Sequence, residues 1–314
     1  MEQFFIVLTQ IGIFLLLILI GIVCMKCGIL DQDSLTSVSK LVMRVALPAY
    51  IFINTVEGAT RQGLLESLLM IPLTALMYLL LWGLSHLLVR LFHLEGNRRK
   101  VFMAVATFGN VGFVGIPLVV ELYPETALLY ISLFTILDQI LFWTYGVSLT
   151  KPVQTEKTPL SLKGLKNLLS PALVAILLGT VLVLLGLHLP GVVTTTLSKL
   201  GAASMPLSLI YVGATLSVTD VRPALKCKEL YAEILLKMLA LPLIYFLIMK
   251  LFPLPGDMVG TATYLVGLPA ISTVPMLCRN NGSDGDYAIC AVMMTTLASL
   301  VTLPLVSLGI ALLS

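Results

Sequence analysis

Charge is what this sequence most lacks. Only 11% of its 314 residues are Asp, Glu, Lys or Arg, whereas soluble domains carry about 25%. Hydrophobic residues make up 58% of the chain, and the mean hydropathy is +1.03. These values exclude an ordinary soluble protein and predict that lipid surrounds most of the chain.

Motifs for catalysis and metal binding are missing as well. The chain has no Walker loop, no metal-protease motif and no nucleophile elbow. Its three histidines have no ligand spacing, and Cys24 and Cys27 have no second pair to complete a zinc site. The basic residues are not interleaved with aromatics as in nucleic-acid binders. We therefore expect no enzyme, no metal, no cofactor and no nucleic-acid partner.

Long apolar runs are abundant instead. A helix needs about 20 apolar residues to cross a bilayer core of about 30 Å, and ten runs approach or exceed that length. A cleaved signal peptide is the alternative for the first run, but this run opens with Glu2 and lacks a basic start and a small-residue cleavage site. We predict an all-α polytopic membrane protein with ten transmembrane helices. The runs are 3–25, 36–56, 64–92, 100–122, 126–149, 171–188, 192–218, 230–252, 257–279 and 286–313.

The positive charges gather in alternate connections between these runs. The connections on the other side offer only Arg61 and Lys250. Because cytoplasmic loops are enriched in Lys and Arg, we expect the basic connections in the cytoplasm and both termini outside it. The basic residues are Lys26; Arg90, Arg98, Arg99 and Lys100; Lys151, Lys157, Lys163 and Lys166; Arg222, Lys226 and Lys228; and Arg279.

The two halves of the chain resemble each other weakly. Residues 39–41 and 198–200 both read Ser-Lys-Leu, and prolines recur with nearly the same displacement, as at Pro117 and Pro275. The displacement of 158 or 159 positions is close to half the chain. We predict a first five-helix repeat over 1–150, a short cytoplasmic linker over 151–170 and a second repeat over 171–314. An odd number of helices per repeat inverts the second half, as alternating access requires.

The fourth and ninth runs carry helix breakers near their middle. The fourth contains ATFGNVGFVGIPLVVELYP (106–124), and the ninth contains YLVGLPAISTVPMLC (264–278). Backbone freed at mid-membrane must be buried in protein or line a wet cavity, and half-helix N-termini attract anions. The alternative is that the glycines only allow close packing and the prolines only kink the helices. The predicted substrate-binding residues are Asn110, Gly112, Gly115, Pro117, Ser272, Thr273 and Pro275.

One carboxylate, Asp138, lies deep within the fifth run. Placing it at the bilayer centre costs about 2.5–3.5 kcal/mol, so such residues often mark an ion or proton path. We take Asp138, with Gln139 and Asn54, as candidates for coupling; the alternative is a structural hydrogen bond or ion pair.

Two further expectations concern basic residues within the apolar runs. Lys40, Arg44 and Lys199 are expected to snorkel or to pair with an acid such as Asp138, and Lys237 to form a local helical pair with Glu233.

The stretches FGNVGFVGIPLVVELYP, FWTYGVSL and TTLASLVTLPL resemble the auxin efflux carrier family, in its bacterial branch. The resemblance implies a ten-helix carrier of two inverted repeats, with a scaffold domain and a mobile transport domain. Its fourth and ninth helices would cross at the substrate site, and the family's asparagine and prolines there fall on Asn110, Pro117 and Pro275. Members move small organic anions: auxin in plant exporters, and malate or malonate in some bacterial relatives. The ninth run has no obvious asparagine at its crossover and offers Ser272 and Thr273 instead.

We therefore expect a secondary active transporter of a small organic anion, working by elevator-type alternating access with proton coupling. A sodium-coupled symporter or exchanger is the alternative, and a non-transporting membrane sensor is a third interpretation. The expected partners are the substrate anion, a proton or sodium ion, membrane lipids and, as one compatible assembly, a second copy of the chain. The expected location is the plasma membrane, which is the inner membrane of a bacterium.

Overall fold

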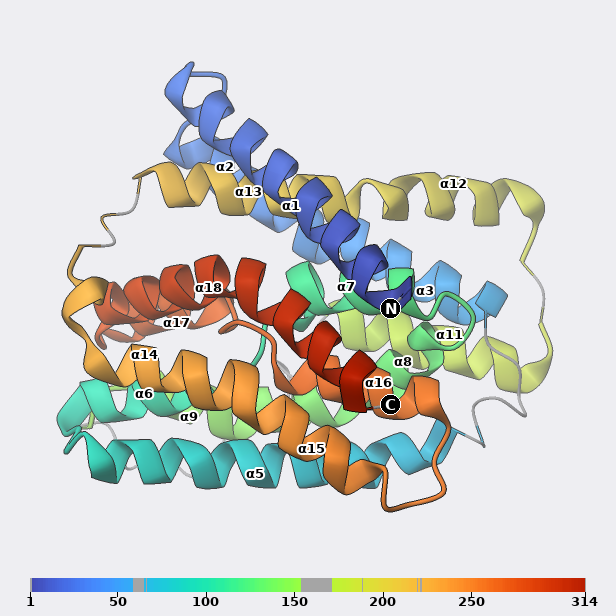
Figure 1. The fold of residues 1–314 in the computed structure, drawn as a ribbon. Coiled ribbons are helices and arrows are strands. Elements are labelled where there is room, and N and C mark those ends of the chain that lie inside the picture. The colour runs from blue at the N-terminus through green and yellow to red at the C-terminus, as the bar shows by residue number, and fades with distance from the viewer. Residues whose placement is uncertain are drawn as a thin grey trace.

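The chain folds into a layered bundle of helices. The computed structural model describes residues 2–58, 65, 67–153, 171–187, 189–218, 220 and 222–313. Within these residues the regular structure is helical, apart from a single β-bridge between Gly109 and Ala270 (Figure 1). The chain is thus an all-helical, polytopic membrane protein, as its composition predicts.

The helices of the first half occupy the first five predicted runs. The α-helices there are α1 (Glu2–Lys26), α2 (Gln32–Leu41), α3 (Leu47–Gly58), α5 (Met70–Leu91), α6 (Gly96–Thr107), α7 (Ile116–Leu122), α8 (Ala127–Leu141) and α9 (Val147–Leu149). Wider π-helical turns join some of them: η1 (Val42–Ala46), η3 (Val111–Gly115) and η4 (Phe142–Gly146), and the 3₁₀ turn η2 (Ser67–Leu69) precedes α5.

The helices of the second half occupy the remaining runs. Its α-helices are α11 (Pro171–Leu185), α12 (Gly191–Ala202), α13 (Ser204–Val218), α14 (Lys228–Leu235), α15 (Leu241–Met249), α16 (Gly256–Val266), α17 (Thr273–Asn281) and α18 (Gly285–Leu313). The π-helical turn η7 (Leu236–Ala240) joins α14 to α15, and the 3₁₀ turn η6 (Ala224–Lys226) precedes α14.

Six described helical stretches are long and apolar enough to cross a membrane by themselves. The fourth and ninth runs are not among them, because a non-helical break interrupts each one at mid-length. The six stretches are Gln32–Glu57, Ser67–Leu91, Ala127–Leu149, Gly191–Val218, Lys228–Met249 and Gly285–Leu313.

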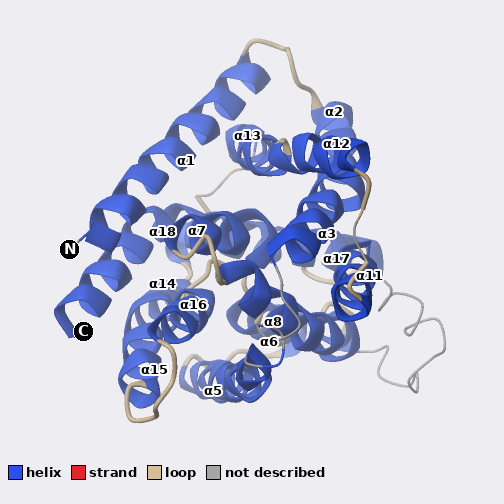
Figure 2. Cartoon of the chain, turned by 90° about the vertical axis from the view of Figure 1, so that its right-hand side faces the viewer, coloured by secondary structure: helices blue, strands red, loops and turns tan. Residues whose placement is uncertain are grey.

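Two groups of helices can be distinguished in Figures 1 and 2. One group holds α1, α2, α3, α11, α12 and α13; the other holds α5, α6, α8 and α14 to α18. Inside the first group, α1 and α13 touch backbone to backbone. A methyl group added to Gly213 would lie 1.9 Å from the carbonyl oxygen of Ile18, and one added to Gly21 would lie 2.1 Å from that of Ile210. Small residues permit this close approach between helices.

Three of the π-helical turns have a common cause. Each ends two residues before a proline: η1 before Pro48, η3 before Pro117 and η7 before Pro242. Proline has no N–H, and its ring collides with the carbonyl one turn earlier in a regular α-helix. Widening the preceding turn relieves that collision and keeps the helix continuous.

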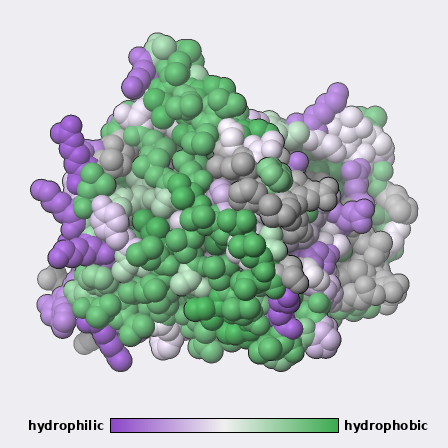
Figure 3. All heavy atoms as spheres, viewed as in Figure 1, coloured by the Kyte–Doolittle hydropathy of each residue, from purple (hydrophilic) through white to green (hydrophobic). Residues whose placement is uncertain are grey.

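The surface carries a broad apolar belt between polar edges (Figure 3). Large side chains such as Leu79, Leu247 and Val301 are exposed on helix faces, as expected where lipid is the solvent. Lys40, Arg44 and Lys199 are also exposed. Of the two expectations for these cations, snorkelling agrees with their exposure, and pairing with Asp138 is wrong because Tyr78 and Gln139 bind that carboxylate.

Candidate functional site

The breaks in the fourth and ninth runs meet inside the protein. The backbone N–H of Asn110 donates to the carbonyl of Pro269 at 2.7 Å, and the N–H of Ile271 donates to the carbonyl of Phe108 at 3.0 Å. These two bonds form the antiparallel bridge between Gly109 and Ala270. Each break therefore satisfies backbone groups that the other has released, which is what buried non-helical backbone requires.

Asn110 caps the half-helix that follows the first break. Its side chain is only 3% exposed, and its Oδ1 accepts a hydrogen bond from the N–H of Phe113 at 3.4 Å. The helical stretch begins directly after it, with η3 preceding α7. Pro117 lies in the first turn of α7, but η3 and α7 are continuous, so the N-terminus of this half-helix lies earlier, directly after Asn110.

The second break has a different set of supports. The N–H of Ala270 donates to Thr295 Oγ1 of α18 at 3.1 Å. Ser272 is the residue before α17, and Pro275 is the third residue of that helix, in its first turn. Ser272 and Thr273 are partly exposed, so polar groups at this break are accessible. Thr295 has no distinguishing sequence pattern, and sequence reasoning missed it.

The glycines of the first break allow close packing. A methyl group on Gly109 would lie 2.9 Å from Leu268 Cβ, and one on Gly115 would lie 2.7 Å from Leu268 Cδ1. Gly112 faces Leu47 with a corresponding distance of 3.2 Å. The packing interpretation therefore applies to these glycines, and a direct role of Gly112 and Gly115 in substrate binding stays a prediction.

Asp138 is separated from the first break by one side chain, that of Tyr78. Tyr78 donates a hydrogen bond to Asp138 Oδ1, and Gln139 Nε2 donates to Oδ2 at 3.0 Å. The Tyr78 ring packs against Phe108, with ring centroids 5.6 Å apart. Asp138 is thus a buried, hydrogen-bonded carboxylate connected to the break through Tyr78. Asn54, the third coupling candidate, lies in α3, and its side chain is outside what the structure describes.

A cavity of about 640 Å³ opens at the end of the molecule that carries the basic connections. It lies between the two helix groups, because α2 and α13 line one side and α6, α17 and α18 the other. The residues of the two breaks do not line it. Its wall includes Gln32, Tyr211, Thr215, Arg98, Arg279 and Tyr287.

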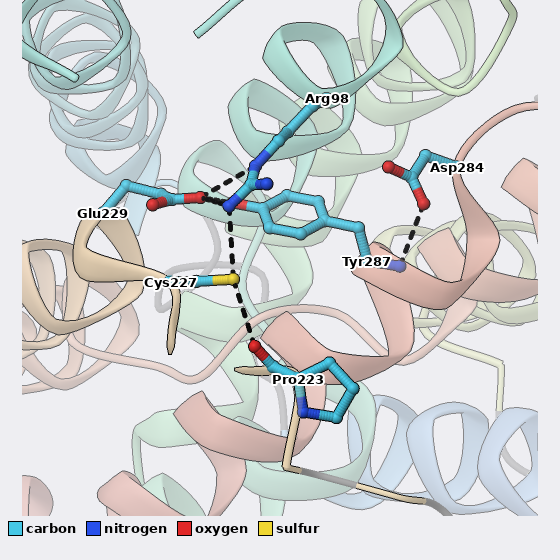
Figure 4. Close-up of polar contacts among 6 residues, drawn as sticks. All are labelled: Arg98, Pro223, Cys227, Glu229, Asp284 and Tyr287. Atoms are coloured by element: carbon cyan, nitrogen blue, oxygen red, sulfur yellow. Dashed lines mark hydrogen bonds and ion pairs between the residues drawn. The ribbon is translucent and has the colours of Figure 1, made fainter. Parts of the chain in front are cut away.

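One wall of the cavity holds a polar cluster (Figure 4). Arg98 donates to Glu229 Oε1 through Nε at 3.0 Å and through Nη2 at 2.5 Å, and its guanidinium lies 4.7 Å from the centre of the Tyr287 ring. The Tyr287 hydroxyl donates to the same Glu229 oxygen at 3.0 Å. Arg98 Nη2 also contacts Cys227 Sγ at 3.2 Å. Burial raises the pKa of the Cys227 thiol, which favours its protonated form.

Glu233 and Lys237 are more than the local helical pair that the sequence predicted. The pair exists, with Lys237 Nζ 3.8 Å from Glu233 Oε1, but both side chains are almost wholly buried. Lys237 Nζ also donates to the carbonyl of Val105, in the last turns of α6, at 3.0 Å. Sequence reasoning missed this burial, although the apolar flanks LLKMLALPLI indicate it.

The chain matches a known family and known relatives over most of its length. The family described as membrane transport protein matches residues 6–307. An uncharacterised transporter of Methanothermobacter thermautotrophicus is 25% identical over 292 residues, which are 93% of this chain and 94% of the relative. An uncharacterised transporter of Methanocaldococcus jannaschii is 26% identical over 213 residues, 65% of this chain and 67% of the relative.

Proposed function

Because this chain belongs to the membrane transport protein family, the family of the auxin efflux carriers, we propose that it is a secondary active transporter of a small organic anion. The proposed substrates are carboxylates, either a dicarboxylate such as malate or malonate or an auxin-like acid. The chain is a membrane transporter by its family. The substrate class rests on the chemistry of the two breaks.

The meeting of the two breaks carries this proposal. Two half-helices begin there, one after the Asn110 cap and one after Ser272. Helix N-termini carry partial positive charge and unsatisfied N–H groups, which bind carboxylates without a buried lysine. The accessible Ser272 and Thr273 side chains supply further hydrogen-bond donors at the second break. An anion is the ligand that this combination of groups fits best.

The arrangement of helices supports an elevator mechanism. We propose that the group containing the breaks moves as one body against the group of α1, α2, α3 and α11 to α13. The cavity between these groups would then be the cytoplasmic access route, with both termini on the other side of the plasma membrane. In this proposal ten transmembrane segments form two inverted repeats, 1–150 and 171–314, joined by the linker 151–170.

Proton coupling through Asp138 is part of the proposal. Its carboxylate accepts a hydrogen bond from Tyr78, whose ring packs against Phe108 of the first break. A change of charge at Asp138 would therefore act on the break through the Tyr78 side chain. Transport by an Asp138→Asn protein that kept its full dependence on a pH gradient would exclude this role. Replacing sodium with choline in the same assay distinguishes a proton from a sodium ion as the coupling ion.

Replacing Asn110 tests the site. Asn110 fixes the N-terminus of the first half-helix, and a loss of about 1.4 kcal/mol in binding free energy corresponds to a tenfold loss of affinity. A thermal-shift screen of carboxylates selects the substrate, and uptake into proteoliposomes then measures KM and the maximal rate. We expect Asn110→Ala to raise KM about tenfold, whereas Asn97→Ala, at the start of the same segment, leaves it unchanged. Unaltered KM and rate in Asn110→Ala would remove this residue from the site.

A further inference from the structure

We propose that Glu233 and Lys237 form a second proton-binding site, which exchanges its proton with the cavity and controls the charge next to the first break. The last step of this inference rests on the proposed transport of an anion. The proton site itself does not, and it can be tested without any substrate.

The first observation is an unsupported buried carboxylate. Glu233 is fully buried, and neither of its oxygens has a hydrogen-bond partner among the described residues. The ammonium of Lys237 lies 3.8 Å from Oε1, which is beyond a hydrogen bond. A buried ion pair compensates for lost hydration only with good geometry and additional hydrogen bonds. Asp138, in contrast, accepts hydrogen bonds from Tyr78 and Gln139, so Glu233 is the carboxylate better placed to accept a proton.

The second observation is a route from the cavity to Glu233. Glu229 lies one helical turn before Glu233, so the two side chains share a face of α14. Glu229 Oε1 accepts hydrogen bonds from Arg98 and from the Tyr287 hydroxyl, as described for Figure 4, and both of these residues line the cavity. The Tyr287 and Glu229 side chains therefore form the part of the route that begins at the cavity. The last transfer, from Glu229 to Glu233 on the next turn of α14, crosses a gap, because no hydrogen bond joins the two carboxylates among the described residues.

The third observation connects the pair to the first break. Lys237 lies in the π-helical turn η7, and its ammonium donates to the carbonyl of Val105 at 3.0 Å. Val105 is three residues before Phe108, whose carbonyl pairs with the second break. When Glu233 takes up a proton, its carboxylate becomes a neutral acid and the net charge of the pair rises from zero to +1. The ammonium left without a counter-ion then favours an anion at the nearby break.

Among the described residues, few other charged groups act on Glu233. Lys237 and Glu229 belong to its own segment, Tyr287 approaches from α18, and Arg98 approaches from α6 through Glu229. On α5, which also packs against α14, Tyr78 binds Asp138 and His86 Nδ1 contacts the carbonyl of Trp82, while Arg90 is exposed. The charge of the site is thus set by the Glu233 and Lys237 pair and by the Glu229 cluster.

Infrared difference spectroscopy of the whole protein in lipid tests the site directly. Acidification of the wild type should produce the carbonyl stretch of a buried, protonated carboxylic acid. Because Asp138 is also proposed to take up a proton, the test uses the Asp138→Asn variant as its background. We expect the band in Asp138→Asn, and also when Asp286→Asn, an exposed control, is added; it should disappear when Glu233→Gln is added instead. A band that survives in the variant carrying both Asp138→Asn and Glu233→Gln, or that is already absent from Asp138→Asn, would overturn the inference. Because the measurement uses no substrate, a negative result would exclude the proton site without bearing on the proposed transport of an anion.

Binding of the substrate chosen by the thermal-shift screen tests the link to the break. A single linked proton changes affinity by up to about tenfold per pH unit, with tighter binding at low pH because protonation frees the Lys237 charge. In the Asp138→Asn background, which removes the other proposed proton site, Glu233→Gln should bind the substrate equally at all pH values at which the substrate is ionised. If that variant does not fold, Glu233→Gln combined with Lys237→Met removes both charges and should show the same flat profile. A pH dependence that remains in these variants contradicts the link.

Discussion

At the scale of single residues, Thr295 holds the second break in place. Its hydroxyl accepts the hydrogen bond of the Ala270 N–H while donating to a carbonyl of its own helix, that of Ala291, at 2.9 Å. Ala270 and Thr295 are both buried, so water cannot replace the hydroxyl as a hydrogen-bond acceptor. Thr295 and Ala270 are 25 positions apart in sequence. The sequence marks the break by Gly267, Pro269 and Pro275 but does not mark its distant partner.

Replacing Thr295 should therefore destabilise the protein. Thr295→Val keeps the shape of the side chain but leaves the Ala270 N–H unsatisfied, which costs about 1–3 kcal/mol. We expect a lower unfolding temperature in a thermal-shift assay in detergent. Thr295→Ser keeps the hydroxyl and should stay close to the wild type. Equal stability of the Val and Ser variants would show that this hydrogen bond does not support the break.

The charged residues show where residue-level prediction reaches its limit. Asp138 stands out in the sequence as an acid in mid-run, and the structure does place it in the interior. Glu233 and Lys237 are four residues apart, a spacing that on most helices means a solvated pair. Their burial depends on α18, which packs against α14 and η7, and on α6, whose Val105 carbonyl accepts a hydrogen bond from Lys237. These contacts are not encoded in the local pattern.

At the scale of helices, prolines and glycines explain most irregularities. Pro48, Pro117 and Pro242 each follow a widened turn, and the breaks fall where glycine and proline cluster in the fourth and ninth runs. These features can be predicted because proline and glycine act through local backbone chemistry. The π-helical turn η4 (Phe142–Gly146) precedes no proline, and its position could not be predicted in this way.

The contact between α1 and α13 gives a prediction at this scale. A methyl group on Gly213 would strike the backbone of Ile18, which cannot move aside as a flexible side chain does. Gly213→Ala should force the two helices apart and cost about 1–3 kcal/mol, as overpacking typically does. Gly12→Ala on α1, where a methyl group meets nothing within 4 Å, is the control. Thermal unfolding of both variants should show a loss only for Gly213→Ala; two equal melting temperatures would contradict the observed contact.

At the scale of the whole molecule, the distribution of charge sets the expected orientation. The connection after α1, which contains Cys27, lies at the same end as the start of α6, Arg98 and the cavity. All of these belong to the basic side that the sequence assigns to the cytoplasm. The alternation of basic and neutral connections could be predicted from the sequence, whereas the cavity could not, because it is formed by helices from both halves of the chain.

Cysteine labelling tests this orientation. Cys27 is exposed, whereas Cys227, Cys278 and Cys290 are buried. A membrane-impermeant maleimide should label Cys27 in inside-out vesicles and leave it unlabelled in right-side-out vesicles. Cys27→Ser is the matched control and should lose most of the signal. Labelling of Cys27 in right-side-out vesicles would reverse the proposed topology.

Protection of the second break by substrate tests the central claim, that an anion binds where the two breaks meet. Ser272 is partly exposed beside the half-helix that begins at Thr273. Ser272→Cys, in a chain whose five cysteines are replaced by serine, provides a thiol at that point, and its rate of reaction with a small maleimide is measured with and without the transported carboxylate. The account predicts that the carboxylate slows this reaction, while labelling of a single cysteine restored at Cys27 keeps its rate. An unchanged rate at Ser272→Cys, in a protein that still transports the carboxylate, would contradict the account.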